Sequence, residues 1–373
     1  MKQKAYLGES SLLKLFDLLQ KQAYKHIFLV RGKKSYALCG AKKIVDDWFS
    51  ASDCHIVEFF DFDENPKYKD IQKGLTLLQS SKAEAIIAIG GGSVLDMAKL
   101  IRFSHSYSGD LTGSKFTKEK DLFPLYAVPT TAGTGCETTH FAVMYKNKVK
   151  YSVAHTDILP EVAIVYPSFT YSNTPYLTAC TGFDALAQAI EAYWNVNATV
   201  ESDKYALKAI ELLWPNLPVV VNSPDKKSRD AVSAGSYWAG KAINITKTTA
   251  PHAMSYGFTS FYGLPHGHAV ALSFPYFFTL NVSETSLVKE NIDLRVYWLK
   301  IDRLKKILDS SNQLDIFIML KKYINSIGLT NQALVGKIDK AEILSSINHD
   351  RIVNNPINIT KDLLSNAFDS IFI

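Results

Sequence analysis

The chain has 373 residues, 47% of them hydrophobic and 21% charged, which is long for one globular domain and suits two domains with sizeable cores. A net charge of only +5, from 41 lysines and arginines against 36 aspartates and glutamates, does not indicate a nucleic-acid-binding protein. The densest apolar run, Phe274–Leu280, is far shorter than the ~20 residues that a membrane-spanning helix needs.

Short apolar runs alternate with helical patterns in the first part of the chain. We expect strands at residues 26–30, 54–59, 85–89, 125–128 and 162–165. This alternation predicts βαβ units in a mainly parallel sheet. After Tyr171 the pattern is helical, and the stretch Pro167–Pro175 marks the change. We therefore predict an α/β nucleotide-binding domain at residues 1–167 and an all-α, metal- and substrate-binding domain at residues 168–373.

A glycine-rich turn directly follows the strand predicted at residues 85–89. Gly90, Gly91 and Gly92 precede Ser93, which we expect to cap a helix that begins near Val94. Glycines let a pyrophosphate approach the main chain, and the helix start offers backbone N–H groups to an anion. The motif is not GxGxxG, and alone it is equally compatible with an ordinary strand–helix turn.

A second polar loop, PTTAGTGCETTH (Pro129–His140), follows the strand predicted at residues 125–128. Its hydroxyl groups come from Thr130, Thr131 and Thr134. A flexible loop would also account for this composition. However, two polar loops at strand ends within one α/β region favour a nucleotide site at the carboxyl edge of the sheet.

Four potential metal ligands occur in the second part of the chain. Asp184 and Gln188 are four residues apart in a predicted helix, so their side chains leave the same face. His252 and His266 follow in one short stretch. Two oxygen donors and two imidazoles form a plausible site for a divalent metal. The spacing by itself also permits the commoner alternative, in which each histidine is a core residue.

These motifs occur together and in order, with a closing NNP at residues 354–356, and the set resembles the iron-containing (group III) alcohol dehydrogenases. That family shares its fold with dehydroquinate synthase. The resemblance spans nearly the whole chain. It implies that NADPH or NADH lies against the glycine turn, where the motif GGGSVLDMAK also contains Asp96, and that Lys150 lies near the nicotinamide ribose. It further implies iron or zinc between a nucleotide-binding domain and a helical domain, bound by Asp184, Gln188, His252 and His266.

Three positions depart from the usual family pattern. Gln188 and Tyr256 stand where the family usually has histidine, and His268 is an additional histidine. With NITKTTAPH (Asn244–His252), these departures resemble the phosphonoacetaldehyde reductase branch, which forms 2-hydroxyethylphosphonate. Lys247 is then expected to bind the phosphonate, although a lone lysine at a helix end is commonly only solvated. Tyr256 or His268 is expected to deliver the proton to the product alkoxide.

The residues after the first of these strands bear on the choice of cofactor. NAD-preferring relatives have an aspartate where this chain has Gly32, flanked by Arg31 and Lys33. Because cations attract a 2′-phosphate, we expect NADPH to be preferred over NADH.

Two rival functions remain open. The first is another group III dehydrogenase acting on a sugar acid, lactaldehyde or a simple alcohol, and the second is a dehydroquinate synthase-type lyase. The N-terminus lacks the apolar core of a signal peptide, so we expect a cytoplasmic enzyme. We expect it to be a homodimer or larger homo-oligomer that acts on a small anionic aldehyde, with neither nucleic acid nor membrane as partner.

Overall fold

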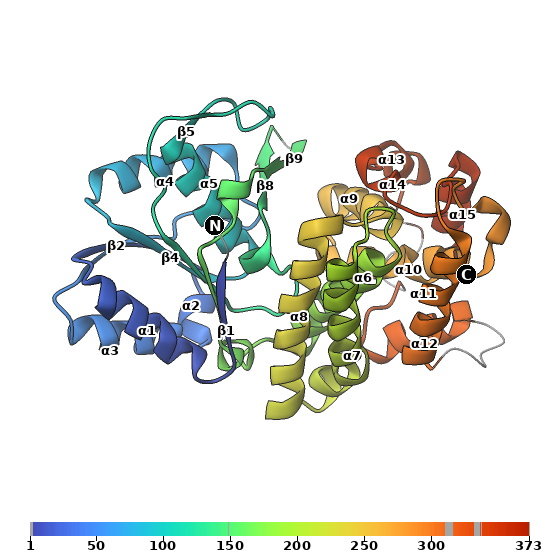
Figure 1. The fold of residues 1–373 in the computed structure, drawn as a ribbon, viewed down its shortest axis with the longest axis horizontal. Helices are drawn as coiled ribbons and strands as arrows, with labels where there is room; N and C mark the ends of the chain where they lie inside the picture. Colours follow the sequence, from blue (N-terminus) through green and yellow to red (C-terminus); the bar gives the residue numbers. More distant parts are fainter. Residues whose placement is uncertain (1–2, 148, 310–315, 332–335, 337, 373) are drawn as a thin grey trace. The chain divides into compact units, whose positions relative to one another are not determined.

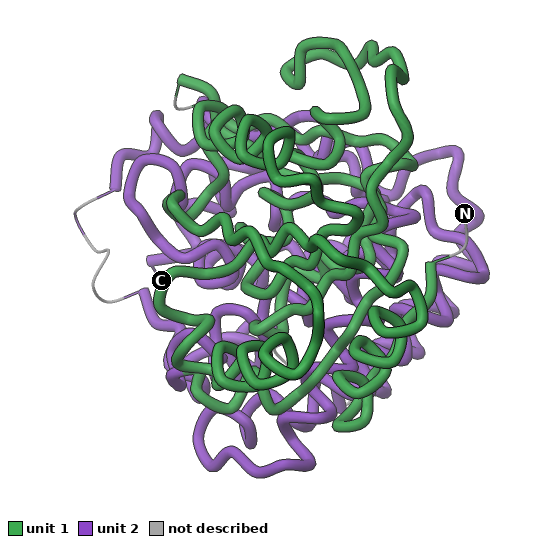
Figure 2. Tube along the Cα trace, turned by 90° about the vertical axis from the view of Figure 1, so that its left-hand side faces the viewer, with its two compact units in different colours: residues 1–173 green, residues 174–373 purple. Residues whose placement is uncertain are grey.

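The computed structural model describes residues 3–147, 149–309, 316–331, 336 and 338–372. The chain forms two compact units, residues 1–173 and 174–373 (Figure 2). This division falls within the Pro167–Pro175 stretch, a few residues after the position proposed from sequence. Among the described residues, the helices include none that is both long and apolar enough to span a bilayer.

A six-stranded, wholly parallel sheet forms the centre of the first unit. Its strand order is β1-β10-β7-β4-β2-β3, with β1 (Lys4–Leu7), β2 (His26–Arg31), β3 (His55–Phe59), β4 (Ala85–Gly90), β7 (Leu125–Pro129) and β10 (Val162–Val165). Five of these strands match the predicted ranges to within one residue at each end. The edge strand β1 was not predicted, because its four half-exposed residues lack a continuous apolar run.

Helices cover both faces of this sheet (Figure 1). Ile27 and Leu29 of β2 pack with α1 (Ser11–Gln22), α2 (Ser35–Leu38) and α3 (Ala41–Ser50) on one face. Phe28 and Val30 point the other way and pack with α4 (Tyr68–Ser80) and α5 (Gly92–Ser106). Because successive strand residues face opposite sides, a sheet covered on both faces needs continuous apolar strands. The outcome is the predicted α/β fold.

Two short antiparallel pairs complete the first unit. One consists of β5 (Tyr107–Ser108) and β6 (Thr117–Lys118), and the other of β8 (Phe141–Lys146) and β9 (Val149–Ala154). Neither hairpin was predicted, because their strands mix polar and apolar residues without a clear alternation over a buried face.

The second unit is helical, as predicted. Its helices are α6 (Pro175–Trp194), α7 (Val200–Asn222), α8 (Lys226–Thr246), α9 (Ala250–Tyr262), α10 (His266–Ser283), α11 (Leu294–Ile307), α12 (Ile316–Ser326), α13 (Lys340–Ser345), α14 (His349–Ile352) and α15 (Lys361–Ser370). The central helix is α6, which packs against α7, α8 and α10. Thr174 caps its start by accepting a hydrogen bond from the Leu177 N–H, and Pro175 occupies its first turn.

Candidate metal centre and cofactor loops

Helix α6 carries three polar side chains along one line of an otherwise apolar, buried helix. Asp184, Gln188 and Glu191 follow one another at spacings of four and three residues, and all three are buried. Residues at these spacings share a helix face. Buried polar and charged side chains are costly unless they are paired or bind a ligand. This line of side chains therefore points to a site rather than to packing.

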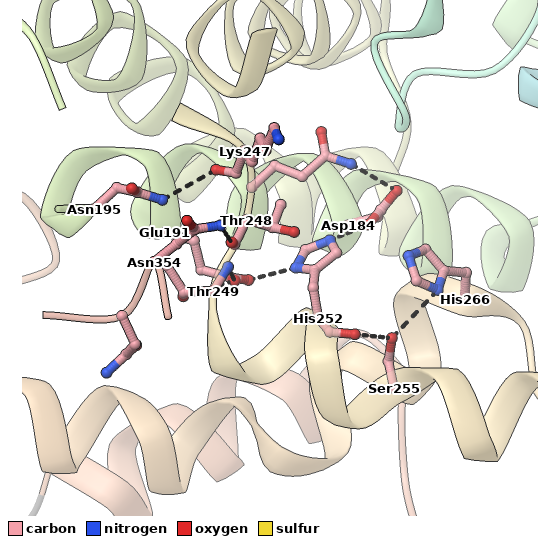
Figure 3. Close-up of polar contacts among 12 residues, drawn as sticks. Asp184, Glu191, Asn195, Lys247, Thr248, Thr249, His252, Ser255, His266 and Asn354 are labelled. Carbon is pink, nitrogen blue, oxygen red and sulfur yellow. Dashed lines mark hydrogen bonds and ion pairs between the residues drawn. The ribbon is translucent and has the colours of Figure 1, made fainter. Parts of the chain in front are cut away.

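Helices α9 and α10 bring the two predicted histidines to Asp184. His252 lies in the first turn of α9, and His266 is the first residue of α10. His252 Nε2 is 3.1 Å from Asp184 Oδ1, and the two imidazole centroids are 5.4 Å apart. One potential ligand atom from each of the three residues lies within 4.8 Å of the other two. Figure 3 shows the three side chains converging from three helices.

Gln188, the fourth predicted metal ligand, also lies at this cluster, but its amide nitrogen rather than its oxygen points towards Asp184. Its Nε2 donates to Asp184 Oδ2 at 3.0 Å, while its buried Oε1 has no hydrogen-bond partner among the described residues. A buried acceptor without a partner costs about 1–3 kcal/mol. Turning the amide over would direct this oxygen towards the ligand cluster, where a cation would satisfy it. The residues present therefore fit a divalent metal ion.

Glu191, which the sequence analysis missed, holds His252 in place. Its Oε1 is 2.5 Å from His252 Nδ1, and its Oε2 accepts hydrogen bonds from the Thr249 N–H and hydroxyl (Figure 3). A carboxylate on Nδ1 leaves Nε2 as the atom available to a metal. Glu191 could have been found from the sequence, because it lies seven residues after Asp184 and residues at this spacing share a helix face.

Charge pairing sets the protonation of this cluster. Burial alone lowers the pKa of His252, but the carboxylates of Glu191 and Asp184 outweigh it and raise that pKa to about 10. Burial raises the pKa of Asp184, but the hydrogen bond from His252 and the charge of His266 outweigh it and bring that pKa below its ordinary value. Without a metal, the cluster thus holds a cationic imidazole between carboxylates.

Ser255 orients the second imidazole. Its hydroxyl donates to the His252 carbonyl at 2.8 Å and lies 3.4 Å from His266 Nδ1 (Figure 3). Because a hydroxyl has only one hydrogen to give, the His266 Nδ1–H is the donor in the second contact. Both histidines therefore offer Nε2 to the shared site.

The segment before His252 is fixed by two asparagines. Asn195 Nδ2 donates to the Lys247 carbonyl at 3.2 Å, and Asn354 Nδ2 donates to the Thr248 carbonyl at 3.0 Å. Asn354 belongs to the NNP motif, which thus holds the turn between α8 and α9. Lys247 is exposed and has a φ of 64°, a strained value for a lysine. Its backbone is held at the turn while its ammonium group faces solvent.

The two predicted proton donors, Tyr256 and His268, have different surroundings. Tyr256 is half-buried, and its ring centroid is 6.3 Å from that of His266. His268 is buried: its Nδ1 is 2.9 Å from the Tyr176 hydroxyl and its Nε2 is 3.0 Å from the Thr330 carbonyl. Because a carbonyl only accepts, Nε2 carries the proton and Nδ1 accepts from Tyr176. Burial also lowers the pKa of His268. These contacts favour Tyr256 as the donor.

In the first unit, the glycine turn joins β4 to α5. The N-cap of α5 is Gly91, and no side chain caps the helix, so the predicted capping role of Ser93 is wrong. The helix begins two residues earlier than expected, which places Ser93 inside its first turn. There the Ser93 hydroxyl accepts from the Asn65 N–H at 3.1 Å. A Cβ on Gly90 would lie 2.4 Å from Val94 Cγ2, so the turn requires glycine there.

The threonine loop lies directly against the glycine turn. The Thr130 N–H donates to the Gly90 carbonyl at 3.0 Å. A Cβ added to Gly92 would lie 3.0 Å from Thr134, and one added to Gly91 would lie 3.5 Å from Thr131. The structure therefore brings together both loops predicted to hold the nucleotide, at the carboxyl ends of the adjacent strands β4 and β7.

Asp96 and Lys150 lie beside these loops. Asp96 is buried in α5, and its Oδ2 accepts from the Val143 N–H of β8 at 2.9 Å. Lys150 is half-buried on β9, the partner strand of β8, and its charge acts on Asp96. Asp96 thus ties the glycine-turn helix to the hairpin that carries Lys150.

A buried carboxylate in the threonine loop makes stability depend on pH. Burial raises the pKa of Glu137 from 4.5 to about 7. Below pH 4.5 both folded and unfolded states are protonated, whereas above pH 7 the folded state bears the cost of a buried charge. At about 1.4 kcal/mol per pKa unit, this cost is about 3.5 kcal/mol.

We therefore expect Glu137→Gln to stabilise the protein at pH 8 by up to about 3 kcal/mol relative to its effect at pH 5. Urea unfolding at the two pH values measures this difference. The exposed Glu64→Gln is the control and is expected to show no such dependence. Parallel pH profiles for wild type and Glu137→Gln would contradict the assignment.

Two family models together match nearly the whole chain. The model for iron-containing alcohol dehydrogenase matches residues 2–167, and that for the C-terminal part of the Fe-containing alcohol dehydrogenase family matches residues 178–369. Long-chain-alcohol dehydrogenase 1 of Geobacillus thermodenitrificans is 33% identical over 279 residues, which cover 73% of this chain and 70% of that protein. Alcohol dehydrogenase 4 of Saccharomyces cerevisiae is 32% identical over 278 residues, covering 73% and 72%.

A solved structure extends this similarity to the fold. Sulfoacetaldehyde reductase from Bifidobacterium kashiwanohense, solved in complex with NAD+, is 26% identical with a TM-score of 0.84, covering 99% of this chain and 96% of that one. The two family matches, the relatives and the converging site residues agree. This chain belongs to the iron-containing alcohol dehydrogenase family and is an oxidoreductase that acts on CH–OH groups.

Proposed function

We propose that this enzyme reduces a small anionic aldehyde, phosphonoacetaldehyde in particular, to its alcohol with a nicotinamide cofactor. The observation that carries the proposal is the cluster of buried Asp184 and His252 with half-buried His266, whose ligand atoms converge within 4.8 Å. Gln188 Oε1 would be the fourth ligand if its amide turned over. A bound iron or zinc ion stabilises the negative charge that develops on a carbonyl oxygen as hydride arrives.

The remaining site residues position the reactants. The glycine turn Gly90–Ser93, with Asp96 in the helix that follows, would hold the pyrophosphate, and Thr130, Thr131, Thr134 and Lys150 would hold the nicotinamide half. Glu191 keeps His252 in the orientation that offers Nε2. Tyr256, whose ring centroid is 6.3 Å from that of His266, would deliver the proton to the alkoxide. His268 instead contacts Tyr176 and the Thr330 carbonyl.

The anionic substrate is supported by Lys247 and by one structural neighbour. Lys247 is held by its backbone five residues before His252, with an exposed side chain. The neighbouring structure is, by its title, a reductase of sulfoacetaldehyde, an aldehyde that carries a tetrahedral oxyanion as phosphonoacetaldehyde does. A lysine ammonium suits either anion as a point charge.

We expect Lys247→Ala to raise KM for phosphonoacetaldehyde about tenfold or more and to leave KM for a neutral aldehyde within about twofold, because only the anion loses a charge-assisted contact. Steady-state kinetics on both substrates measure this. Lys241→Ala serves as the control, because Lys241 lies within α8, where its ammonium is over the Tyr205 ring. Equal KM changes for the two substrates would rule out an anion-binding role for Lys247.

Oxidation of NADH and NADPH with a panel of aldehydes tests the function as a whole. The proposal predicts that kcat/KM for phosphonoacetaldehyde exceeds that for acetaldehyde and for long-chain aldehydes by at least about tenfold. A preference for long-chain aldehydes would instead align this enzyme with its Geobacillus relative. Net consumption of reduced cofactor also excludes a lyase with an internal redox cycle. From the family alone we further infer that the enzyme is a homodimer or larger homo-oligomer, which analytical sedimentation tests. We also infer that it is located in the cytoplasm, which cell fractionation tests.

Gln188→His is expected to tighten zinc binding by about tenfold or more, because imidazole is a stronger donor than an amide oxygen for this metal. Competition against a chromophoric chelator measures the affinity. Gln188→Leu, which removes the oxygen at similar volume, is the matched comparison and is expected to weaken binding. If Gln188→Leu binds zinc as tightly as wild type, Gln188 is not a ligand.

A further inference from the structure

The carboxyl end of β2 lies beside the glycine turn. The Gly32 N–H donates to the Ile89 carbonyl at 3.3 Å, and Ile89 is followed at once by Gly90. In sheets of this kind, the residue at the end of the strand next to the glycine turn meets the adenosine ribose, where NADPH carries its additional phosphate. The partners of Arg31 and Lys33 therefore bear on the choice between the two cofactors.

Arg31 is firmly held by a neighbouring strand. Its Nε and NH2 atoms donate to Glu58 Oε1 and Oε2 of β3 at 3.0 and 2.8 Å, a bidentate pair. Its guanidinium lies 3.7 Å from the Phe60 ring centroid, and its NH1 donates to the Gly32 carbonyl at 3.2 Å. The Arg31 side chain is only 12% exposed. Its charge is thus paired, and three of its five N–H donors are already in use.

Lys33 also faces carboxylates, but loosely. Its Nζ is 3.8 Å from Asp61 and 3.5 Å from Asp63, and these side chains are 84% and 68% exposed. Exposed pairs at such distances contribute little and rearrange readily. Arg31 is therefore the cation whose pairing bears on cofactor choice, and Glu58 is the residue that pairs with it.

We propose that Glu58 is a specificity-determining residue that competes with the 2′-phosphate of NADPH for Arg31 and so directs this enzyme towards NADH. NADPH must displace Glu58 from the guanidinium and leave that carboxylate beside a phosphate. NADH carries a 2′-hydroxyl and leaves the Arg31–Glu58 pair intact. This proposal rests on the proposed use of a nicotinamide cofactor, and it reverses the NADPH preference expected from the basic residues alone.

Fluorescence titration of the full-length enzyme with NADH and with NADPH tests the proposal through the two dissociation constants, without any aldehyde. Wild type is expected to bind NADH more tightly. Glu58→Gln is expected to tighten NADPH binding roughly tenfold while changing NADH binding less than about twofold. Asp61→Asn removes the same charge nearby without touching Arg31, and it is expected to have a clearly smaller effect on NADPH.

Arg31→Gln provides the second arm. In that background Glu58→Gln should no longer improve NADPH binding, because the guanidinium for which Glu58 and the 2′-phosphate compete is absent. An unchanged ratio of the two dissociation constants in Glu58→Gln would overturn the proposal, as would the same gain with and without Arg31. Circular dichroism of each variant checks the fold. If Glu58→Gln shifts the ratio but phosphonoacetaldehyde is not reduced, only the proposed substrate fails.

Discussion

Replacing Asp184 by asparagine is expected to lower kcat/KM for aldehyde reduction by roughly a thousandfold or more and to abolish tight metal binding. Asp184 is the only one of the three clustered ligand residues with a formal negative charge, and it contacts both His252 and Gln188. The amide keeps the shape of the side chain but removes the charge that attracts a divalent cation. Losing the metal removes its stabilisation of the developing oxyanion.

Steady-state kinetics and elemental analysis of the same preparations measure both effects. Asp203→Asn is the matched control, since Asp203 pairs with Lys300 in the same unit and its loss removes an equal charge. That control is expected to retain metal and most activity. Asp184→Asn protein with a full metal complement and wild-type kcat/KM would show that the cluster is structural.

Replacing Gly267 by alanine is expected to separate His266 from Asp184 and thereby weaken metal binding by at least about a hundredfold. A Cβ at this position would lie 1.8 Å from the Cys180 carbonyl oxygen and 3.0 Å from Asp184 Cβ. The nearest atom, the Cys180 carbonyl oxygen, belongs to the backbone of α6. Rotating a side chain cannot relieve this clash, so α10 must move away from α6. Metal affinity depends on placing ligands to within a few tenths of an ångström.

Zinc titration and thermal unfolding of the apoprotein separate this effect from simple overpacking. Gly235→Ala is the comparison, because the atoms nearest to its Cβ would belong to the Leu213 and Leu212 side chains rather than to the backbone or to a metal ligand. Both variants are expected to lose about 1–3 kcal/mol of stability, but only Gly267→Ala should lose zinc affinity. Equal zinc affinities in the two variants would contradict the role of Gly267.

The elements that were predicted correctly share a strong local signal. Four of the five predicted strands, β2, β4, β7 and β10, are largely apolar and buried, because helices cover both faces of the sheet. The convergence of Asp184, His252 and His266 was predictable from residue type and family pattern. Their mutual distances were not, because they depend on how closely α10 approaches α6 at Gly267, which is a property of packing rather than of spacing.

Features that depend on a partner remote in sequence were missed or misjudged. Arg31 was counted as a free cation, whereas Glu58 on the adjacent strand β3 pairs with it. Ser93 fits the preference for a helix cap, but the turn starts the helix at Gly92 and leaves the Ser93 hydroxyl to Asn65. Glu191 was overlooked because its role requires His252, which lies sixty-one residues later.

The most direct test of the metal centre is the iron and zinc content of the full-length enzyme, determined after metal loading and dialysis and compared with His266→Ala treated identically. We expect about one divalent ion per chain in the wild type and almost none in His266→Ala, because the variant removes one of three clustered ligands. A wild-type enzyme that holds no metal, or a His266→Ala variant that retains it in full, would contradict the account.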